Sequence, residues 1–213
     1  MKQLAILGAS GHGRVIADAA ELSGWQKPIF FDDAWPSVEV NGPWSIEGDT
    51  KVLIERLSVF DAVAVAIGNN RIRALKLAKL SEAGGNIVTI VHPSAVVSRY
   101  ASIEVGSVIL ANAVVNASAK LGSGVIVNTG AVIEHDCVVG DYAHISPNAM
   151  LAGGVRVGEL AWIGASAAVR QLIEVGEGAI VGMGSVVTRD VPTGVTVAGV
   201  PAKTVSAKAV KVL

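Results

Sequence analysis

The sequence predicts an α/β domain with a Rossmann-like parallel sheet over residues 1–92, followed by a left-handed parallel β-helix of hexapeptide repeats over residues 93–213. Three observations support this prediction: strand patterns that alternate with helix patterns in the first part, a strict six-residue repeat in the second, and a composition rich in small apolar residues. Of the 213 residues, 51% are hydrophobic, only 4% are aromatic, and 24 are glycine. Such a composition favours strands and tight turns over helices packed through large side chains.

The first part begins with an apolar strand, Leu4 to Leu7, a glycine-rich turn over 8–13 and a helix pattern over 15–22. Further strands are expected over 29–31, 62–67 and 87–91, and a second helix over 72–82. Strands that alternate with helices predict a parallel sheet. Residues 34–50 fit no regular pattern.

Ligands of parallel α/β sheets bind at the carboxyl ends of the strands. The features expected there are the turn Gly8 to Gly13, the pair Asp32 and Asp33, and residues 68–70. The turn suits a phosphate at a helix N-terminus, and the carboxylates suit a ribose or a base N–H. The turn reads G-x-x-G-x-G, not the dinucleotide fingerprint G-x-G-x-x-G, so we expect a nucleotide-type ligand other than NAD. Simple tight turns remain the alternative.

The second part carries an aliphatic residue at every sixth position, sixteen times in succession: Val97, Ile103, Ile109, Val115, Leu121, Val127, Ile133, Val139, Ile145, Leu151, Val157, Ile163, Val169, Val175, Val181 and Val187. The residue four positions later is mostly small, as in Ala101, Ser107 and Ala113. Neither a helix nor a simple strand gives this period. It predicts a three-faced prism in which about 18 residues form one coil, with the aliphatic side chains inside and the coils stacked about 4.8 Å apart.

The charge balance and hydropathy exclude several classes of partner. Lys and Arg total 17 and Asp and Glu total 18, which gives no reason to expect nucleic acid or an anionic membrane. Mean hydropathy is +0.54, yet polar residues interrupt every apolar run well below the roughly 20 residues of a spanning helix. No signal-peptide core is present, and Cys137 is the only cysteine. We therefore expect a soluble cytoplasmic protein without membrane insertion or an intrachain disulfide.

His135 is the strongest candidate for a general base among the 4 histidines. It follows an inward aliphatic residue by two positions, which places it at a corner of the prism, and Asp136 beside it could orient the ring or raise its basicity. Neighbouring side chains of a strand point to opposite faces, so this pairing needs a bend in the backbone. One coil later comes Gly153, which would leave room for a thioester and its pantetheine arm. An exposed histidine without a role is the alternative.

A metal site is disfavoured. Zinc needs at least three ligands facing one point. His135 and His144 are nine residues apart, half a coil, and so lie on opposite sides of the prism, and no third histidine follows at the coil spacing. Cys137 occupies a small inward position, which predicts a core residue and not a nucleophile.

Several motifs occur together and in order: the turn 8–13, Asp32 with Asp33, and the segments 67–73, 127–129, 133–136 and 198–203. Over nearly the whole chain this set resembles the bacterial sugar acetyltransferases of the NeuD/PglD type, in particular the UDP-4-amino-sugar (UDP-N-acetylbacillosamine) N-acetyltransferases. The resemblance implies a homotrimer with active sites between adjacent β-helices. It implies His135 as the base, Asp136 as the residue that raises its basicity, and Asn128 nearby.

The resemblance also implies two binding regions. The UDP part of the substrate would be held by Ser10, Gly11, His12, Asp32, Asp33, Asn69 and Arg73. Acetyl-CoA, a co-substrate, would lie against His144, Gly153, Ala165 and Met183. Members of the family often have a small residue in place of Met183, and some have Glu in place of Asp136.

The reaction expected from these residues is direct transfer of an acetyl group from acetyl-CoA to the C4 amine of a UDP-4-amino-4,6-dideoxy sugar, with a backbone N–H such as that of Gly153 stabilising the oxyanion. A sugar O-acetyltransferase acting on sialic acid or a related sugar is the main alternative, because the same base serves a hydroxyl. Arg14, Arg71 and Arg73 could clamp a sialic acid carboxylate. A non-enzymatic nucleotide-sugar sensor or scaffold is a further alternative.

Overall fold

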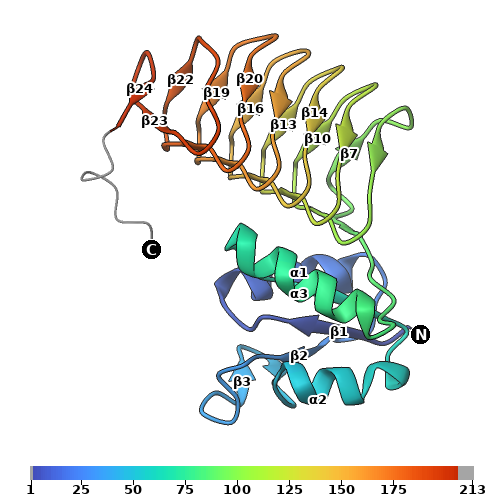
Figure 1. Cartoon of the computed structure of the whole chain (residues 1–213). Coiled ribbons are helices and arrows are strands. Elements are labelled where there is room, and N and C mark those ends of the chain that lie inside the picture. The colour runs from blue at the N-terminus through green and yellow to red at the C-terminus, as the bar shows by residue number, and fades with distance from the viewer. Residues whose placement is uncertain (1, 206–213) are drawn as a thin grey trace.

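The computed structural model describes residues 2–205, so residues 206–213 of the expected second domain lie outside the described residues. Figure 1 shows an α/β domain below a solenoid of stacked coils. The α/β domain contains a parallel sheet in the order β2-β1-β5. Its main elements are β1 (Leu4–Leu7), α1 (Gly11–Leu22), β2 (Ile29–Phe31), β5 (Ala62–Val65) and α3 (Asn70–Glu82). The predicted parallel sheet followed by a β-helix is therefore confirmed.

The segment without a sequence pattern forms short elements. It contains a hairpin of β3 (Val40–Asn41) and β4 (Trp44–Ser45), then α2 (Thr50–Glu55) and a 3-10 turn η1 (Leu57–Val59). The strand expected over 87–91 is divided between two sheets. Ile87 bridges to Val63 in the α/β domain, whereas β6 (Ile90–Val91) pairs with the solenoid strand β9 (Val108–Ile109). The chain therefore enters the solenoid without an intervening linker.

The α/β domain packs directly on the solenoid. One face of its sheet contacts α1, and the other contacts α2 and α3. A single apolar cluster joins Ile6 and Ile16 of the domain to Val108, Leu110 and Ile126 of the solenoid. These solenoid side chains are at most 2% exposed. Burial of this apolar surface stabilises the position of α1 against the solenoid.

The solenoid has three faces, each a sheet of short strands. All of these strands are parallel except the last one of the third face, which pairs antiparallel with its neighbour. The first face contains β7 (Val96–Val97), β10 (Val114–Val115), β13 (Val132–Ile133), β16 (Met150–Leu151), β19 (Ala168–Val169) and β22 (Val186–Val187). The second face contains β8 (Ser102–Ile103), β11 (Lys120–Leu121), β14 (Val138–Val139), β17 (Arg156–Val157) and β20 (Glu174–Val175). The third face contains β6, β9, β12 (Ile126–Val127), β15 (His144–Ile145), β18 (Trp162–Ile163), β21 (Ile180–Val181), β23 (Thr196–Ala198) and β24 (Lys203–Thr204).

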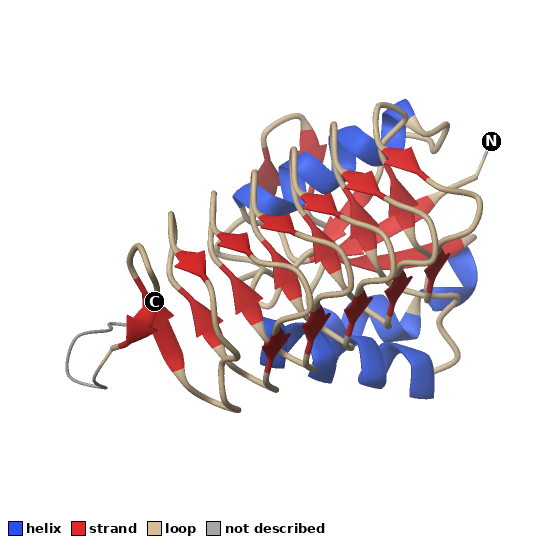
Figure 2. Cartoon of the chain, turned by 90° about the horizontal axis from the view of Figure 1, so that it is seen from above, coloured by secondary structure: helices blue, strands red, loops and turns tan. Residues whose placement is uncertain are grey.

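The strand register is the 18-residue coil that the repeat predicts. Val115, for example, pairs with Ile133, and Ile133 pairs with Leu151. The second residue of nearly every strand points inward, and from Ile109 onward these aliphatic side chains are buried in one continuous core. Figure 2, seen from above, shows the strands of successive coils stacked in rows. The first residue of each strand points outward and gives each face its surface chemistry.

The corners depend on a left-handed backbone that recurs every six residues. Fourteen consecutive repeat positions from Gly106 to Gly184 have φ between 56° and 74°, and eight of them are not glycine. The amide nitrogens at these corners donate to carbonyls of the preceding coil, as in Gly154 N to His135 O at 2.9 Å. Leu160 and Leu172 also adopt this conformation, although it disfavours side chains with a Cβ. The stacking of coils overrides local preference there.

No helix within residues 2–205 is long and apolar enough to cross a membrane.

Candidate active site

His135 and Asp136 form the charged pair of the candidate site. They lie at the corner that follows β13, and Asp136 has a left-handed φ of 60°. This conformation provides the bend that the pairing requires, and His135 Nδ1 lies 2.8 Å from Asp136 Oδ2. Both side chains are accessible, with 64% and 66% of their surface exposed. A carboxylate only accepts, so Nδ1 carries the proton and Nε2 presents a free lone pair.

The pair makes His135 a stronger base than a free imidazole. The hydrogen bond to Asp136 raises the pKa of His135, desolvation opposes it, and the charges of Asp136 and Glu134 raise the pKa further. Asn116 Nδ2 donates to Glu134 Oε2 at 3.0 Å and holds that second carboxylate at the corner. The Nε2 atom of His135 is thus suited to remove a proton from an amine or a hydroxyl.

Gly153 lies directly against the His135 ring, one coil further along. A Cβ built at Gly153 would lie 2.6 Å from both Cε1 and Nε2 of His135. No such atom could be accommodated without moving the imidazole. The count of 18 residues therefore brings His135 and Gly153 together, and a hydrogen at position 153 keeps the reactive edge of the ring open.

Ala165 and Met183, expected at acetyl-CoA, lie with Asn128 on the opposite edge of the first face. His144, the remaining residue expected there, belongs to β15 of the third face. His135 and Gly153 follow strands of the first face, whereas Asn128, Ala165 and Met183 precede its strands. One hexad separates the two edges, a distance of at most about 20 Å. Asn128 contacts His144, with Nδ2 3.2 Å from His144 Nε2, and does not contact His135. Within one chain these three residues thus lie at the edge of the first face opposite to the edge that carries the base.

Two imidazoles and an indole line up where the α/β domain meets the third face. The ring of His12, from the start of α1, lies 6.4 Å from that of His144, and the ring of His144 lies 5.9 Å from that of Trp162 at an angle of 6°. Burial lowers the pKa of His12 to about 4, and the charge of Arg73 contributes. Burial, Arg73 and His12 lower the pKa of His144 to about 3. Both rings are therefore neutral at pH 7.

A pocket of about 260 Å³ lies at the carboxyl ends of the domain's strands, where the sequence predicts a nucleotide. Its walls include Ser10, Asp32, Asp33, Gly68 and Lys76. Ser10 precedes α1 and its hydroxyl makes no capping bond, so it is available to a ligand. Nothing lies within 4 Å of a Cβ built at Gly11, whereas one at Gly13 would strike the carbonyl oxygen of Gly8. Gly13 therefore allows α1 to approach β1 closely.

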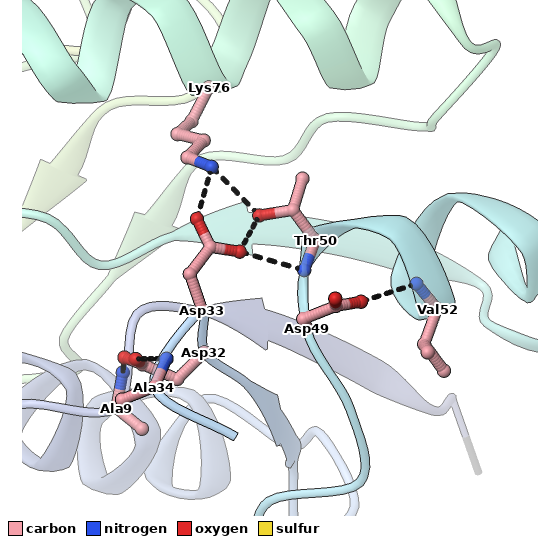
Figure 3. Close-up of polar contacts among 8 residues, drawn as sticks. All are labelled: Ala9, Asp32, Asp33, Ala34, Asp49, Thr50, Val52 and Lys76. Atoms are coloured by element: carbon pink, nitrogen blue, oxygen red, sulfur yellow. Dashed lines mark hydrogen bonds and ion pairs between the residues drawn. The ribbon is translucent and has the colours of Figure 1, made fainter. Parts of the chain in front are cut away.

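The two carboxylates of this pocket are already engaged within the protein, as Figure 3 shows. Asp32 accepts hydrogen bonds from the backbone N–H groups of Ala9 and Ala34. Asp33 accepts from both the N–H and the hydroxyl of Thr50 and lies 2.6 Å from Lys76 Nζ. Burial works against the charge of Asp33, but the hydrogen bonds from Lys76 and Thr50 and the charge of Lys76 lower its pKa to about 2. Asp33 is thus an anion at neutral pH.

Arg73 differs from its expected role in holding UDP. It is 1% exposed and lies between α3 and the solenoid. Its guanidinium donates to Gly124 O at 2.8 Å and Tyr142 O at 2.6 Å, and also to the carbonyls of Ile67, Gly68 and Ala143 and to Asn70 Oδ1. No donor remains for a substrate. Asn69 caps α3 by accepting from Ile72 N at 3.1 Å.

A larger groove of about 390 Å³ adjoins the pocket, because Gly68 lines both. Asn69, Arg71 and His144 also line this groove, together with Trp162 and Ile180. Sequence reasoning assigned no role to Trp162, Ile180 or Lys76. The signal available for the first two was their outward position on the third face, where large apolar side chains are 18 residues apart. Lys76 had no such signal.

Among residues 2–205, no group of three or more His, Cys, Asp or Glu side chains could hold a metal ion.

Comparisons with known proteins point to sugar acetyltransferases. Residues 3–80 match the family model of the PglD N-terminal domain, and residues 118–153 match that of the bacterial transferase hexapeptide (six repeats). UDP-N-acetylbacillosamine N-acetyltransferase of Bacillus subtilis (strain 168) is 40% identical over 114 residues. That match spans 52% of this chain and 52% of the relative, so the chain matches about half the length of this curated relative.

Solved structures of sugar acetyltransferases resemble nearly the whole chain. The acetyltransferase domain of PglB from Neisseria gonorrhoeae FA1090 is 40% identical with a TM-score of 0.91, covering 96% of this chain and 100% of that one. The same domain is also known in complex with acetyl coenzyme A. A mutant of perosamine N-acetyltransferase from Caulobacter crescentus, in complex with CoA and GDP-perosamine, is 36% identical with a TM-score of 0.92, covering 97% and 98%.

Proposed function

This chain belongs to the N-acetyltransferase family that includes the PglB acetyltransferase domain and perosamine N-acetyltransferase, and on that premise we propose that it acetylates the C4 amine of a UDP-4-amino-4,6-dideoxy sugar, as in UDP-N,N'-diacetylbacillosamine biosynthesis. Acetyl-CoA is the acetyl donor. The α/β domain, residues 1–92, binds the nucleotide part of the substrate, and the β-helix, residues 93–213, catalyses the transfer. The observation that carries this proposal is the His135–Asp136 pair against Gly153, because a general base there has the Nε2 edge of its ring unobstructed by a side chain at position 153.

The reaction proceeds by direct transfer. The neutral amine attacks the thioester carbonyl and forms the new C–N bond while His135 Nε2 takes the amine proton. A backbone N–H near Gly153 stabilises the negative oxygen of the tetrahedral intermediate. The C–S bond then breaks, and the CoA thiolate leaves and is protonated. Asp136 holds the ring by its Nδ1–H and stabilises the imidazolium that forms.

The chain functions as a homotrimer with active sites between neighbouring copies. The first face supports this assembly, because every outward side chain on it is apolar: Val96, Val114, Val132, Met150, Ala168 and Val186. Of these, Val96 is 63% exposed and Met150 40%. Outward residues of the second face include Lys120, Arg156 and Glu174, and the α/β domain covers part of the third. An uninterrupted apolar face of this kind favours contact with another copy.

This assembly would complete the site. The edge of one copy that carries His135 and Gly153 would meet the edge of the next copy that carries Asn128, Ala165 and Met183. Acetyl-CoA would then lie between two chains, near His144 of one of them. The nucleotide would lie in the pocket lined by Ser10, Asp32 and Asp33, beside the start of α1 that carries Gly11 and His12. The sugar would be directed toward the groove beside Gly68.

Two of the three arginines that could clamp a carboxylate form hydrogen bonds within the protein, which supports an amine acceptor over sialic acid. Arg73 donates only to the protein, and Arg14 Nε donates to Asn41 Oδ1. Only Arg71 of the three lines the groove. These three arginines therefore do not form a preformed clamp of two guanidinium groups for a carboxylate.

Thiol release from acetyl-CoA in the presence of the UDP-4-amino sugar tests the activity. We expect turnover that His135→Ala abolishes. Turnover with sialic acid and none with the amino sugar would assign the chain to the O-acetyltransferases, and nucleotide-sugar binding without any turnover would favour a sensor or scaffold. Co-expression of His135→Ala with Asn128→Ala tests the shared site. Mixed trimers would contain interfaces with both residues intact and regain activity, whereas sites confined to one chain would stay inactive.

A further inference from the structure

Lys76 is a cation in the nucleotide pocket to which the motifs of the sequence assign no role. It projects from α3, and its Nζ lies 2.6 Å from Asp33 Oδ2 and 2.8 Å from Thr50 Oγ1 (Figure 3). Thr50 is itself 4% exposed and donates to Asp33 through both its N–H and its hydroxyl. Three elements, β2, α2 and α3, thus converge on one fixed ion pair at the pocket wall.

The pair has one donor and one acceptor left over. An ammonium group has three N–H donors, and two of those on Lys76 are directed to Asp33 and Thr50. Asp33 Oδ1 accepts both bonds from Thr50, whereas Oδ2 accepts only from Lys76. One N–H of Lys76 and one lone pair of Asp33 Oδ2 therefore stand side by side in a pocket of about 260 Å³.

The position of the pair within the pocket indicates which part of a nucleotide it meets. Gly68 lines both the pocket and the adjoining groove, whereas Asp33 and Lys76 line only the pocket. The diphosphate is expected at the N-terminus of α1, a helix of 12 residues, near Ser10. The sugar must continue toward the groove, so the base occupies the end that carries Asp33 and Lys76.

We infer that Lys76 and Asp33 read the base of the nucleotide and select uracil over cytosine. This inference rests on the proposed function, because it assumes a nucleotide sugar in the pocket. Uracil presents a keto oxygen next to its N3–H, which matches the N–H of Lys76 and the lone pair of Asp33. Cytosine reverses the order, with an amino group at position 4 and a bare N3. Donor would then face donor and acceptor would face acceptor, leaving polar groups unpaired.

Titration calorimetry with UDP and CDP tests this inference on the full chain. Wild type is expected to bind UDP at least about tenfold more tightly than CDP, because CDP would leave a donor and an acceptor of the pocket unpaired. In Lys76→Met the preference should fall to about one, while Lys79→Met, an exposed lysine of the same helix, should keep the wild-type ratio. The wild-type ratio alone tests the inference if Lys76→Met fails to fold.

Two outcomes would overturn the inference. One is equal binding of UDP and CDP by wild type. The other is a loss of affinity in Lys76→Met that is the same for both nucleotides, which would assign Lys76 to the phosphates or the ribose. Either result can occur while the chain still acetylates a UDP-amino sugar. Conversely, a clear preference for UDP without acetyl transfer would contradict the proposed activity and leave the recognition of uracil supported.

Discussion

The left-handed φ of Asp136 is the conformational detail on which the candidate base depends. In an extended strand the side chains of residues 135 and 136 would point to opposite sides. At φ 60° the carboxylate instead reaches the ring at 2.8 Å. The same conformation recurs at every sixth residue for reasons of coil geometry, so the corner needs no special backbone to hold the pair.

Asp136→Asn should shift the pH profile of the reaction. The base acts when neutral, so kcat/KM rises with pH through the pKa of His135. Asp136 raises that pKa, and its replacement should move the rise toward lower pH, close to the ordinary value of about 6.5. The plateau should fall by about tenfold to a hundredfold, because a weaker base removes the proton.

Glu134→Gln is the matched control for that profile. Glu134 acts on His135 through charge without a hydrogen bond, so the profile should shift in the same direction by less. An unchanged profile in Asp136→Asn would separate Asp136 from catalysis.

Among the elements, α3 fixes the α/β domain on the solenoid. Asn70 Nδ2 donates to Leu160 O at 2.9 Å, and Arg73 donates to Gly124 O and Tyr142 O. These three carbonyls belong to left-handed corner residues of three successive coils. The pitch of a helix, about 5.4 Å, is close to the coil spacing of about 4.8 Å, so residues one turn apart on α3 can meet neighbouring coils.

Arg73→Ala should destabilise the protein strongly. Its removal leaves several buried carbonyls without donors, and the free energy of unfolding should fall by about 3 kcal/mol or more. Urea unfolding measures the change, with Arg71→Ala as the matched control on the exposed side of the same helix. Equal unfolding midpoints for the two variants would contradict this role of Arg73.

The elements differ in how clearly the sequence predicts them. The hexads were predictable because an aliphatic residue recurs at every sixth position sixteen times, so a polar residue at any of these positions would be evident. The stack of His135 on Gly153 followed from the count of 18 residues. The hairpin β3–β4 and the six-residue helix α2 are too short to show a period. The role of Arg73 was missed because a local motif does not reveal which side of α3 a distant segment covers.

At the scale of the whole molecule, the three faces of one prism have three different surfaces. The third is covered near its start by the α/β domain, the second is largely charged, and the first is apolar and open. The inside of the prism is the same on all three faces, so the outward residue of each strand alone makes this distinction. Core packing and surface chemistry are thereby coded in alternate residues of the same strands.

Met150→Glu should convert the proposed trimer into single chains. A carboxylate at the middle of the first face would have to be buried without a partner, which is costly. Light scattering should show a mass of about one third, and acetyl transfer should be lost although His135 is intact. Val138→Glu, at the equivalent outward position of the second face, should leave both mass and activity unchanged. A trimeric Met150→Glu protein would argue for another interface.

The six-residue recurrence of left-handed corners means that the length of this molecule can change only in whole steps. Loss of one residue between Leu151 and Val181 would turn every later aliphatic side chain out of the interior and every outward side chain in. Loss of 18 residues would remove one complete layer and leave the rest as before. A gene encoding such a chain can thus gain or lose entire coils, whereas deletion of a single codon inside the prism would prevent the later coils from folding. The distance from the His135 corner to the far end of the prism can therefore change only by whole coils.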